Sequence, residues 1–124
     1  MPHHLLRLMV RHPIAAIAIV MSLIVLGCAT IEDLAPPVDA TMIELAGAHE
    51  IDIDRLSRGR ELYITACAQC HRPEPIIRYA QDQWRRILPR MSMLARLAPD
   101  DAEAVEVYLR LTLQAADLRH GGDP

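Results

Sequence analysis

From Asp52 onward, three stretches of the chain space their hydrophobic residues as amphipathic helices do. Asp54 can cap the first, which is expected to run up to Cys67. The second begins near Asp82, and Pro89 is expected to break or restart it. The third begins at Pro99, with acidic residues in its first turn. No segment alternates hydrophobic and polar residues as a strand does, so the pattern predicts an all-α domain.

The N-terminal residues are patterned as an export signal. Two arginines, Arg7 and Arg11, precede an apolar run from Ile14 to Leu26. The run ends in Val-Leu-Gly-Cys, which resembles a bacterial lipobox and makes Cys28 a candidate for lipidation. The alternative is an uncleaved membrane-spanning helix, since an extension through Ile31 reaches 18 residues. Both interpretations place the rest of the chain at the periplasmic side of a bacterial membrane, anchored to it.

The next segment shows no sustained period. Pro36 and Pro37 forbid a helix across them, so residues 28–51 are interpreted as a lipidated N-terminus and a flexible tether. The alternative is that Met42 to His49 packs onto the domain as a strap. The resulting organisation is a signal or hydrophobic segment at 1–27, the tether at 28–51, a folded domain at 52–116 and a tail at 117–124.

Composition limits what this domain can do. Aromatic residues make up only 3% of the chain, with one Trp, three Tyr and no Phe, so bulky core volume is scarce. A large apolar cofactor would fill that deficit. The net charge is −3, and it becomes −5 without residues 1–27, which hold two arginines and no acid. Nucleic acid is therefore not an expected partner.

A single short motif carries the chemistry. Cys67-Ala68-Gln69-Cys70-His71 has the spacing of a haem c attachment site. Two thiols three residues apart can reach the two vinyl groups of a porphyrin, and the imidazole that follows is then held beneath the iron. We therefore expect one covalently bound haem, attached through Cys67 and Cys70, with His71 as an iron ligand.

Two other uses of paired cysteines lack the parts they need. A zinc site requires further ligands, but outside the signal segment only His49 and His120 remain, far from the motif in the sequence. A thioredoxin-like redox pair requires a βαβ context, which the pattern does not predict. The assignment of Cys28 to lipid and of the other two cysteines to haem leaves no spare thiol.

From about Asp52 to Ala115 the chain resembles the small class I cytochromes c. Gly59 and Tyr63 resemble the small residue and the aromatic residue at which the first helix of that family crosses the last, and Tyr108-Leu109 resembles their partner. The resemblance implies three or four helices around one haem. A proline after the motif, Pro73 or Pro75 here, also resembles the family, in which a nearby carbonyl accepts the second imidazole proton.

The family implies a methionine as the sixth iron ligand, and two are in range. Met91 shares an apolar stripe with Trp84, whereas Met93 lies on the side of Arg86 and Arg90. Met91 is therefore the first choice and Met93 the second, with His120, water or an open site as further alternatives. Trp84 is a candidate to stack on the haem or donate a hydrogen bond near it. The arginines that follow Trp84 are weaker candidates to neutralise a haem propionate, and are better explained as a solvated basic face.

The expected function is electron transport rather than catalysis. With both axial positions of the iron filled, reversible one-electron chemistry is what remains. The partners would be a redox protein donor and acceptor at the membrane. The alternatives are a fixed haem subunit of a respiratory or photosynthetic complex and, less favoured, an open-site sensor or enzyme.

Overall fold

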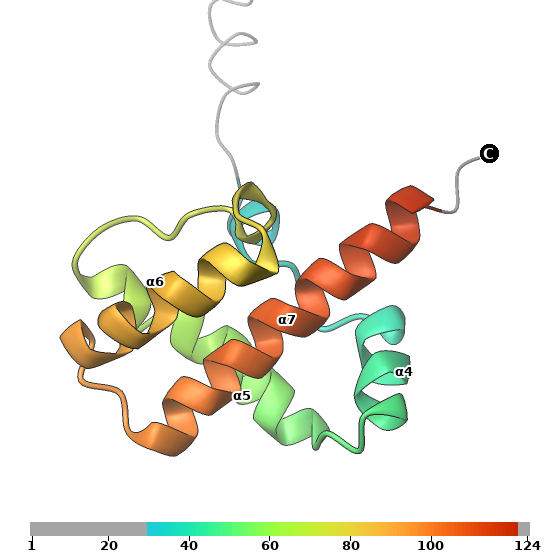
Figure 1. The fold of residues 1–124 in the computed structure, drawn as a ribbon, viewed down its shortest axis with the longest axis horizontal. Coiled ribbons are helices and arrows are strands. Elements are labelled where there is room, and N and C mark those ends of the chain that lie inside the picture. Colours follow the sequence, from blue (N-terminus) through green and yellow to red (C-terminus); the bar gives the residue numbers. More distant parts are fainter. Residues whose placement is uncertain (1–29, 122–124) are drawn as a thin grey trace, which may run out of the picture.

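The computed structural model describes residues 30–121, and within them the chain forms α-helices and short 3₁₀ turns but no strand, as predicted. The elements are α3 (Ile31–Leu34), α4 (Ala40–Ala48), α5 (Ile53–Ile64), η1 (Cys67–Gln69), η2 (Ile76–Arg78), α6 (Gln81–Leu94) and α7 (Pro99–Gly121). The long helix α7 runs through the centre and α5 crosses it, while α6 lies beside the N-terminal half of α7 and α4 beside its C-terminal half (Figure 1). The core therefore lies along α7.

The crossing of α5 over α7 depends on Gly59. A Cβ atom at this position would lie 2.1 Å from the Ala104 carbonyl oxygen and 2.8 Å from the Tyr108 Cβ. The backbones can approach this closely only because the residue has no side chain. The rings of Tyr63 and Tyr108 pack beside the crossing with centroids 6.3 Å apart. The contact predicted from Gly59, Tyr63 and Tyr108 is confirmed, and Ala104 is an additional partner.

We expect Gly59→Ala to lower the free energy of unfolding by about 3 kcal/mol or more, because the new methyl group meets backbone that cannot rotate away. Gly47→Ala, within α4, is the matched control because a Cβ there meets nothing within 4 Å. The control should be stabilised by about 0.5–1 kcal/mol through helix propensity. Chemical denaturation of both variants measures the difference, and equal stabilities would contradict the close packing.

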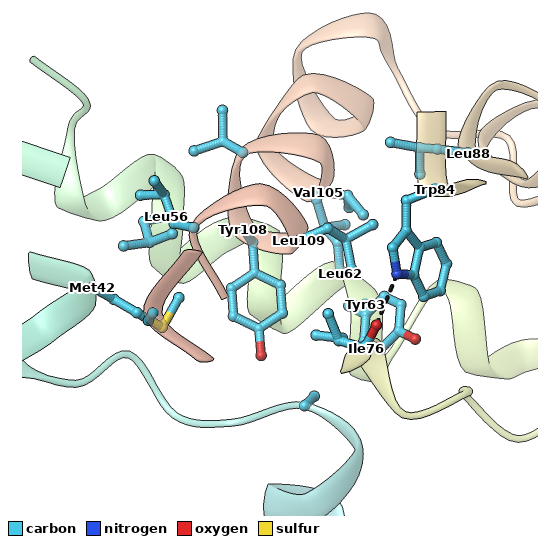
Figure 2. Packing of buried hydrophobic residues seen from close by; sticks show 14 of the residues in the cluster. Met42, Leu56, Leu62, Tyr63, Ile76, Trp84, Leu88, Val105, Tyr108 and Leu109 are labelled. Atoms are coloured by element: carbon cyan, nitrogen blue, oxygen red, sulfur yellow. Dashed lines mark hydrogen bonds between the residues drawn. The ribbon is translucent and has the colours of Figure 1, made fainter. Parts of the chain in front are cut away.

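The core is a continuous cluster along α7 (Figure 2). Leu56, Val105, Tyr108 and Leu111 are fully buried. The Tyr108 hydroxyl donates a 2.7 Å hydrogen bond to the Pro36 carbonyl, and burial raises the pKa of Tyr108 to about 12. The hydroxyl therefore stays protonated and ties the N-terminal residues to α7.

The prediction of a flexible tether is wrong for the described part of this segment, and the alternative that Met42 to His49 packs onto the domain as a strap is correct; the attachment extends back to Leu34. Asp39 caps α4 by accepting from the Met42 N–H at 2.9 Å, and Met42 and Ala46 are buried against the domain. The Arg60 guanidinium donates to the carbonyls of Ala35 and Pro36 at 3.2 and 3.0 Å. We call residues 30–51 the N-terminal strap. The folded unit therefore begins well before the expected residue 52.

Two helix ends also differ from expectation. The cap of α5 is Asp52, whose carboxylate accepts from the Asp54 N–H at 2.9 Å, so Asp54 is not the cap but lies inside the helix. At the other end of the chain, α7 continues to Gly121, and its Arg119 pairs with Asp39 of the strap at 2.8 Å. Residues 117–121 therefore belong to the last helix and are not a separate tail.

Pro89 does not break α6, contrary to the prediction. The helix continues from Gln81 to Leu94, and Pro89 is exposed on the side away from the core. A proline inside a helix removes the hydrogen bond to the carbonyl four residues earlier, here that of Arg85. At an exposed position water can satisfy that carbonyl, so the cost is tolerated. The residues after Pro89 therefore keep the helical phase of those before it.

Candidate functional site

A cavity of about 430 Å³ opens beside the motif. Its walls are the end of α5, η1 with the loop that follows, and the inner face of α6, and Leu109 closes it from α7. Most of the lining side chains are apolar. The cavity has the size and character of a cofactor or ligand site.

Local geometry aligns the two thiols. α5 ends at Ile64 and is capped by Thr65, whose hydroxyl donates to the Glu61 carbonyl, and the chain then tightens into the 3₁₀ turn η1. In such a turn residues three apart lie on the same side. Cys67 and Cys70 accordingly both line the cavity, Cys67 half-buried and Cys70 exposed, each with a free thiol. Burial raises the pKa of Cys67, so its thiol is protonated when unmodified.

His71 lines the same cavity with one ring nitrogen already engaged. Its Nδ1 lies 2.8 Å from the Arg72 carbonyl oxygen. A carbonyl only accepts, so Nδ1 carries a proton, and in the neutral ring Nε2 is then the nitrogen with a lone pair for a ligand or metal. The carbonyl expected near Pro73 or Pro75 is therefore that of Arg72, directly before Pro73.

The two methionines occupy opposite environments. Met91 is half-buried and lines the cavity, whereas the Met93 side chain is 70% exposed and lies outside it. The apolar stripe predicted for α6 is confirmed, since all six of its members line the cavity: Trp84, Ile87, Leu88, Met91, Leu94 and Ala95. Met91 is thus the methionine that shares a cavity with the motif.

Trp84 forms part of the cavity wall, but its polar atom is already paired. The indole N–H donates a 2.9 Å hydrogen bond to the Ile76 carbonyl, and the residue is only 8% exposed (Figure 2). Trp84 can therefore offer its ring to a cofactor, whereas the expected hydrogen bond from its N–H would require this pairing to break.

Sequence reasoning missed the aromatic residues around Trp84 as cavity residues. Tyr79 packs edge-on against Trp84 at 5.4 Å and Tyr63 at 6.1 Å, and both line the cavity. The Tyr63 hydroxyl donates to the Glu74 carbonyl, and burial raises its pKa. The sequence offered one signal for these residues, because a chain with only four aromatic residues has few that can line a site. All four belong to one cluster next to the motif.

Several candidates do not line the cavity. His120 lies in the last turn of α7, and His49 follows α4. Arg86 pairs with Asp82 at 2.7 Å on the exposed face of α6, which agrees with its interpretation as part of a solvated basic face. Cys28, the lipidation candidate, lies outside the described residues.

The residues present fit a haem better than a single bound ion. Within residues 30–121 no group of three or more His, Cys, Asp or Glu side chains is arranged to hold a metal ion, so Cys67, Cys70 and His71 do not form such a group. The same three residues do border an apolar cavity, with Met91 on the helix that forms its other wall. A flat apolar cofactor that brings its own iron suits this arrangement.

Comparisons with protein-family models, with curated proteins and with solved structures gave no match. In the part of the chain that the structure describes, none of the helices is both long enough and apolar enough to span a membrane.

Proposed function

We propose that the protein is a monohaem c-type cytochrome that passes single electrons between redox partners at a membrane. One observation carries the proposal. One apolar cavity is bordered by all four residues that the motif and the helical phase select: Cys67, Cys70, His71 and Met91. The His71 ring uses Nδ1 for its bond to the Arg72 carbonyl, which leaves Nε2 for a ligand. Four residues with the chemistry of haem attachment and axial ligation are thus gathered at one place.

Each residue has a defined task in this proposal. The Cys67 and Cys70 sulfur atoms would hold the group covalently, and His71 and Met91 would be the ligands of its iron. When bound, the group supplies reversible one-electron chemistry at iron. Trp84, Leu88 and the rest of the apolar wall would surround the group with nonpolar side chains, and a thioether ligand favours the reduced iron.

The packing of the helices supports a class I cytochrome c-like fold. The close approach of α5 and α7 at Gly59 lies one turn before Tyr63, which reaches the cavity. The same crossing therefore holds α5, the motif that follows it and α7 together. The resemblance noted in the sequence predicts this contact.

A potentiometric titration of the purified full-length chain tests the function. We expect the visible spectrum to change reversibly along a one-electron curve, with about 59 mV per tenfold change in the ratio of oxidised to reduced protein. Trp84 provides a second signal because it is the only tryptophan and lies at the cavity, so bound haem should quench its fluorescence. A chain without a reversible one-electron transition would contradict the proposal.

The packed strap favours a second candidate, a fixed haem subunit of a larger membrane complex. A free shuttle gains from a long flexible tether, but residues 30–51 are held by Arg60 and Tyr108 to the folded domain. If Cys28 or the hydrophobic segment anchors the chain, little slack remains between anchor and domain. Gentle solubilisation followed by native electrophoresis separates the candidates, since stable comigration with other subunits indicates the complex and migration alone indicates the shuttle.

A further inference from the structure

Acidic residues are concentrated at one end of the described chain. Residues 30–54 contain no arginine or lysine and seven acids: Glu32, Asp33, Asp39, Glu44, Glu50, Asp52 and Asp54. Residues 55–121 contain eleven arginines and eight acids, a net charge of +3. The negative net charge of the described chain therefore lies in the N-terminal strap and the start of α5. The residues that line the cavity begin only at Tyr63.

The main helix of the strap, α4, has apolar residues on both sides. Met42 and Ala46 are buried against the domain. The opposite side is exposed, and a Cβ atom at Gly47 would meet nothing within 4 Å there. A helix that is apolar on all sides is usually buried on all sides. We give the name α4 face to the exposed residues of this helix, which are Ala40, Ile43, Glu44, Gly47 and Ala48.

Glu44 decides what can cover the α4 face. It lies four residues after Ala40 and four before Ala48, so it is near the middle of the face. None of the ion pairs among residues 30–121 includes it. A carboxylate that is buried at an interface is strongly destabilising unless a basic group pairs with it. A partner that covers this face must therefore bring a lysine or arginine to Glu44, and anionic lipid has the wrong charge.

Glu50 adds a second carboxylate just beyond the end of the same helix. It is exposed, and the ion pairs of the described residues do not include it. Its φ of 54° lies in the left-handed region that favours glycine. An acid is also disfavoured there by the negative end of the helix dipole. The stability of the fold does not explain a glutamate at this position, whereas contact with a basic partner does.

We propose that the α4 face binds a helix of a partner protein that carries an apolar stripe with lysine or arginine beside it. The small residues Ala40 and Gly47 let a helix approach closely, Ile43 supplies apolar contact, and the two glutamates pair with the basic side chains. The inference goes beyond the proposed function, because α4 lies beside the C-terminal half of α7 and does not line the cavity (Figure 1). A partner bound here leaves the cavity residues uncovered.

Binding is tested on the full-length chain, labelled with ¹⁵N-glycine, in phosphatidylcholine nanodiscs. The chain has only five glycines, so the spectrum is simple, and Gly47→Ala assigns the Gly47 signal. The probe is a peptide of about four helical turns with leucines at helical spacing and lysines elsewhere. We expect it to shift the Gly47 signal and to leave that of Gly59, at the α5–α7 crossing, unchanged. The same peptide with glutamate in place of lysine should shift neither.

Charge variants locate the contact. Glu44→Gln/Glu50→Gln should weaken binding of the lysine peptide about tenfold. The control Asp100→Asn/Glu106→Gln removes two exposed acids of α7 that also lack an ion pair within the described residues, and it should have little effect.

Glu50→Gly separates binding from folding. It should bind the peptide more weakly than wild type and yet unfold at a higher denaturant concentration, because glycine suits a φ of 54°. Ile43→Ser should also weaken binding, whereas Ile77→Ser, which changes an exposed isoleucine of η2, should not.

Equal effects of the two pairs of charge variants, or an equal Gly47 shift with the glutamate peptide, would overturn the docking surface. A Gly47 shift in phosphatidylglycerol nanodiscs without peptide would assign the face to lipid. A shift that grows with the number of chains per nanodisc, again without peptide, would assign it to a second copy of the chain. Either result overturns the proposal. The glycine signals do not require haem, whose presence the visible spectrum reports separately.

Discussion

Replacing both motif cysteines, Cys67→Ala/Cys70→Ala, is expected to abolish covalent haem attachment completely. Both thiols line the cavity, and no other cysteine is present in residues 30–121. Haem that enters the variant would be held by axial ligands and apolar contacts alone, and denaturation would release it. Haem-stained denaturing gels measure the loss, and Trp84 fluorescence after denaturation and desalting should rise relative to wild type because the quencher is gone.

Cys28→Ser is the matched control for this variant, since it removes a cysteine outside the motif. We expect its haem content to equal that of wild type, while its release from the membrane fraction tests lipidation. Covalent haem retained in the double variant, or lost equally in Cys28→Ser, would show that the motif is not the attachment site.

Met91→Ala is expected to remove the oxidised-state sulfur-to-iron absorption band and to lower the redox potential. Met91 is the methionine that lines the cavity, and a thioether ligand stabilises reduced iron. A tenfold weaker preference for the reduced state corresponds to about 59 mV, and we expect a larger fall than that. Absorption spectra and potentiometric titration of the variant provide the measurement.

Met93→Ala is the control for the ligand assignment, because its side chain is exposed two residues away on the other side of α6. Its band and potential should match wild type. Loss of the band in Met93→Ala alone would reverse the assignment. Absence of the band in wild type would instead indicate an open or differently ligated iron.

The helices that form the site could be predicted because their hydrophobic residues recur at helical spacing. The stripe from Trp84 to Ala95 specified the inner face of α6, and its phase separated Met91 from Met93. Pro89 was misjudged for a physical reason: the cost of a proline depends on whether the freed carbonyl meets water, and exposure is not visible in a sequence. The cap of α5 was misplaced by two residues because Asp52 and Asp54 both suit that position.

The N-terminal strap could not be predicted from periodicity. Its two helices are short, and its attachments are made by residues distant in the sequence, Arg60 and Tyr108, to the carbonyls of Ala35 and Pro36. Backbone acceptors leave no mark on side-chain patterns. The same limit applies to Tyr79, whose place in the cavity wall depends on the path of the loop after the motif.

The core of the site was easier to anticipate than its surroundings. Cys67, Cys70 and His71 are neighbours in sequence, so local geometry alone keeps them together, and η1 turns both thiols toward one side. The His71 bond to the Arg72 carbonyl is also local. The cavity opposite the motif is formed by tertiary packing of α6, and so its volume and its aromatic wall required the structure.

The most direct test of the account is the intact mass of the wild-type chain under denaturing conditions. The chain would be produced in a bacterial host that attaches haem to exported cytochromes. We predict a polypeptide heavier by one haem, with a peptide containing Cys67 to His71 carrying the added mass through both cysteines. A denatured chain that shows the mass of the polypeptide alone, with Cys67 and Cys70 as unmodified thiols, would contradict it.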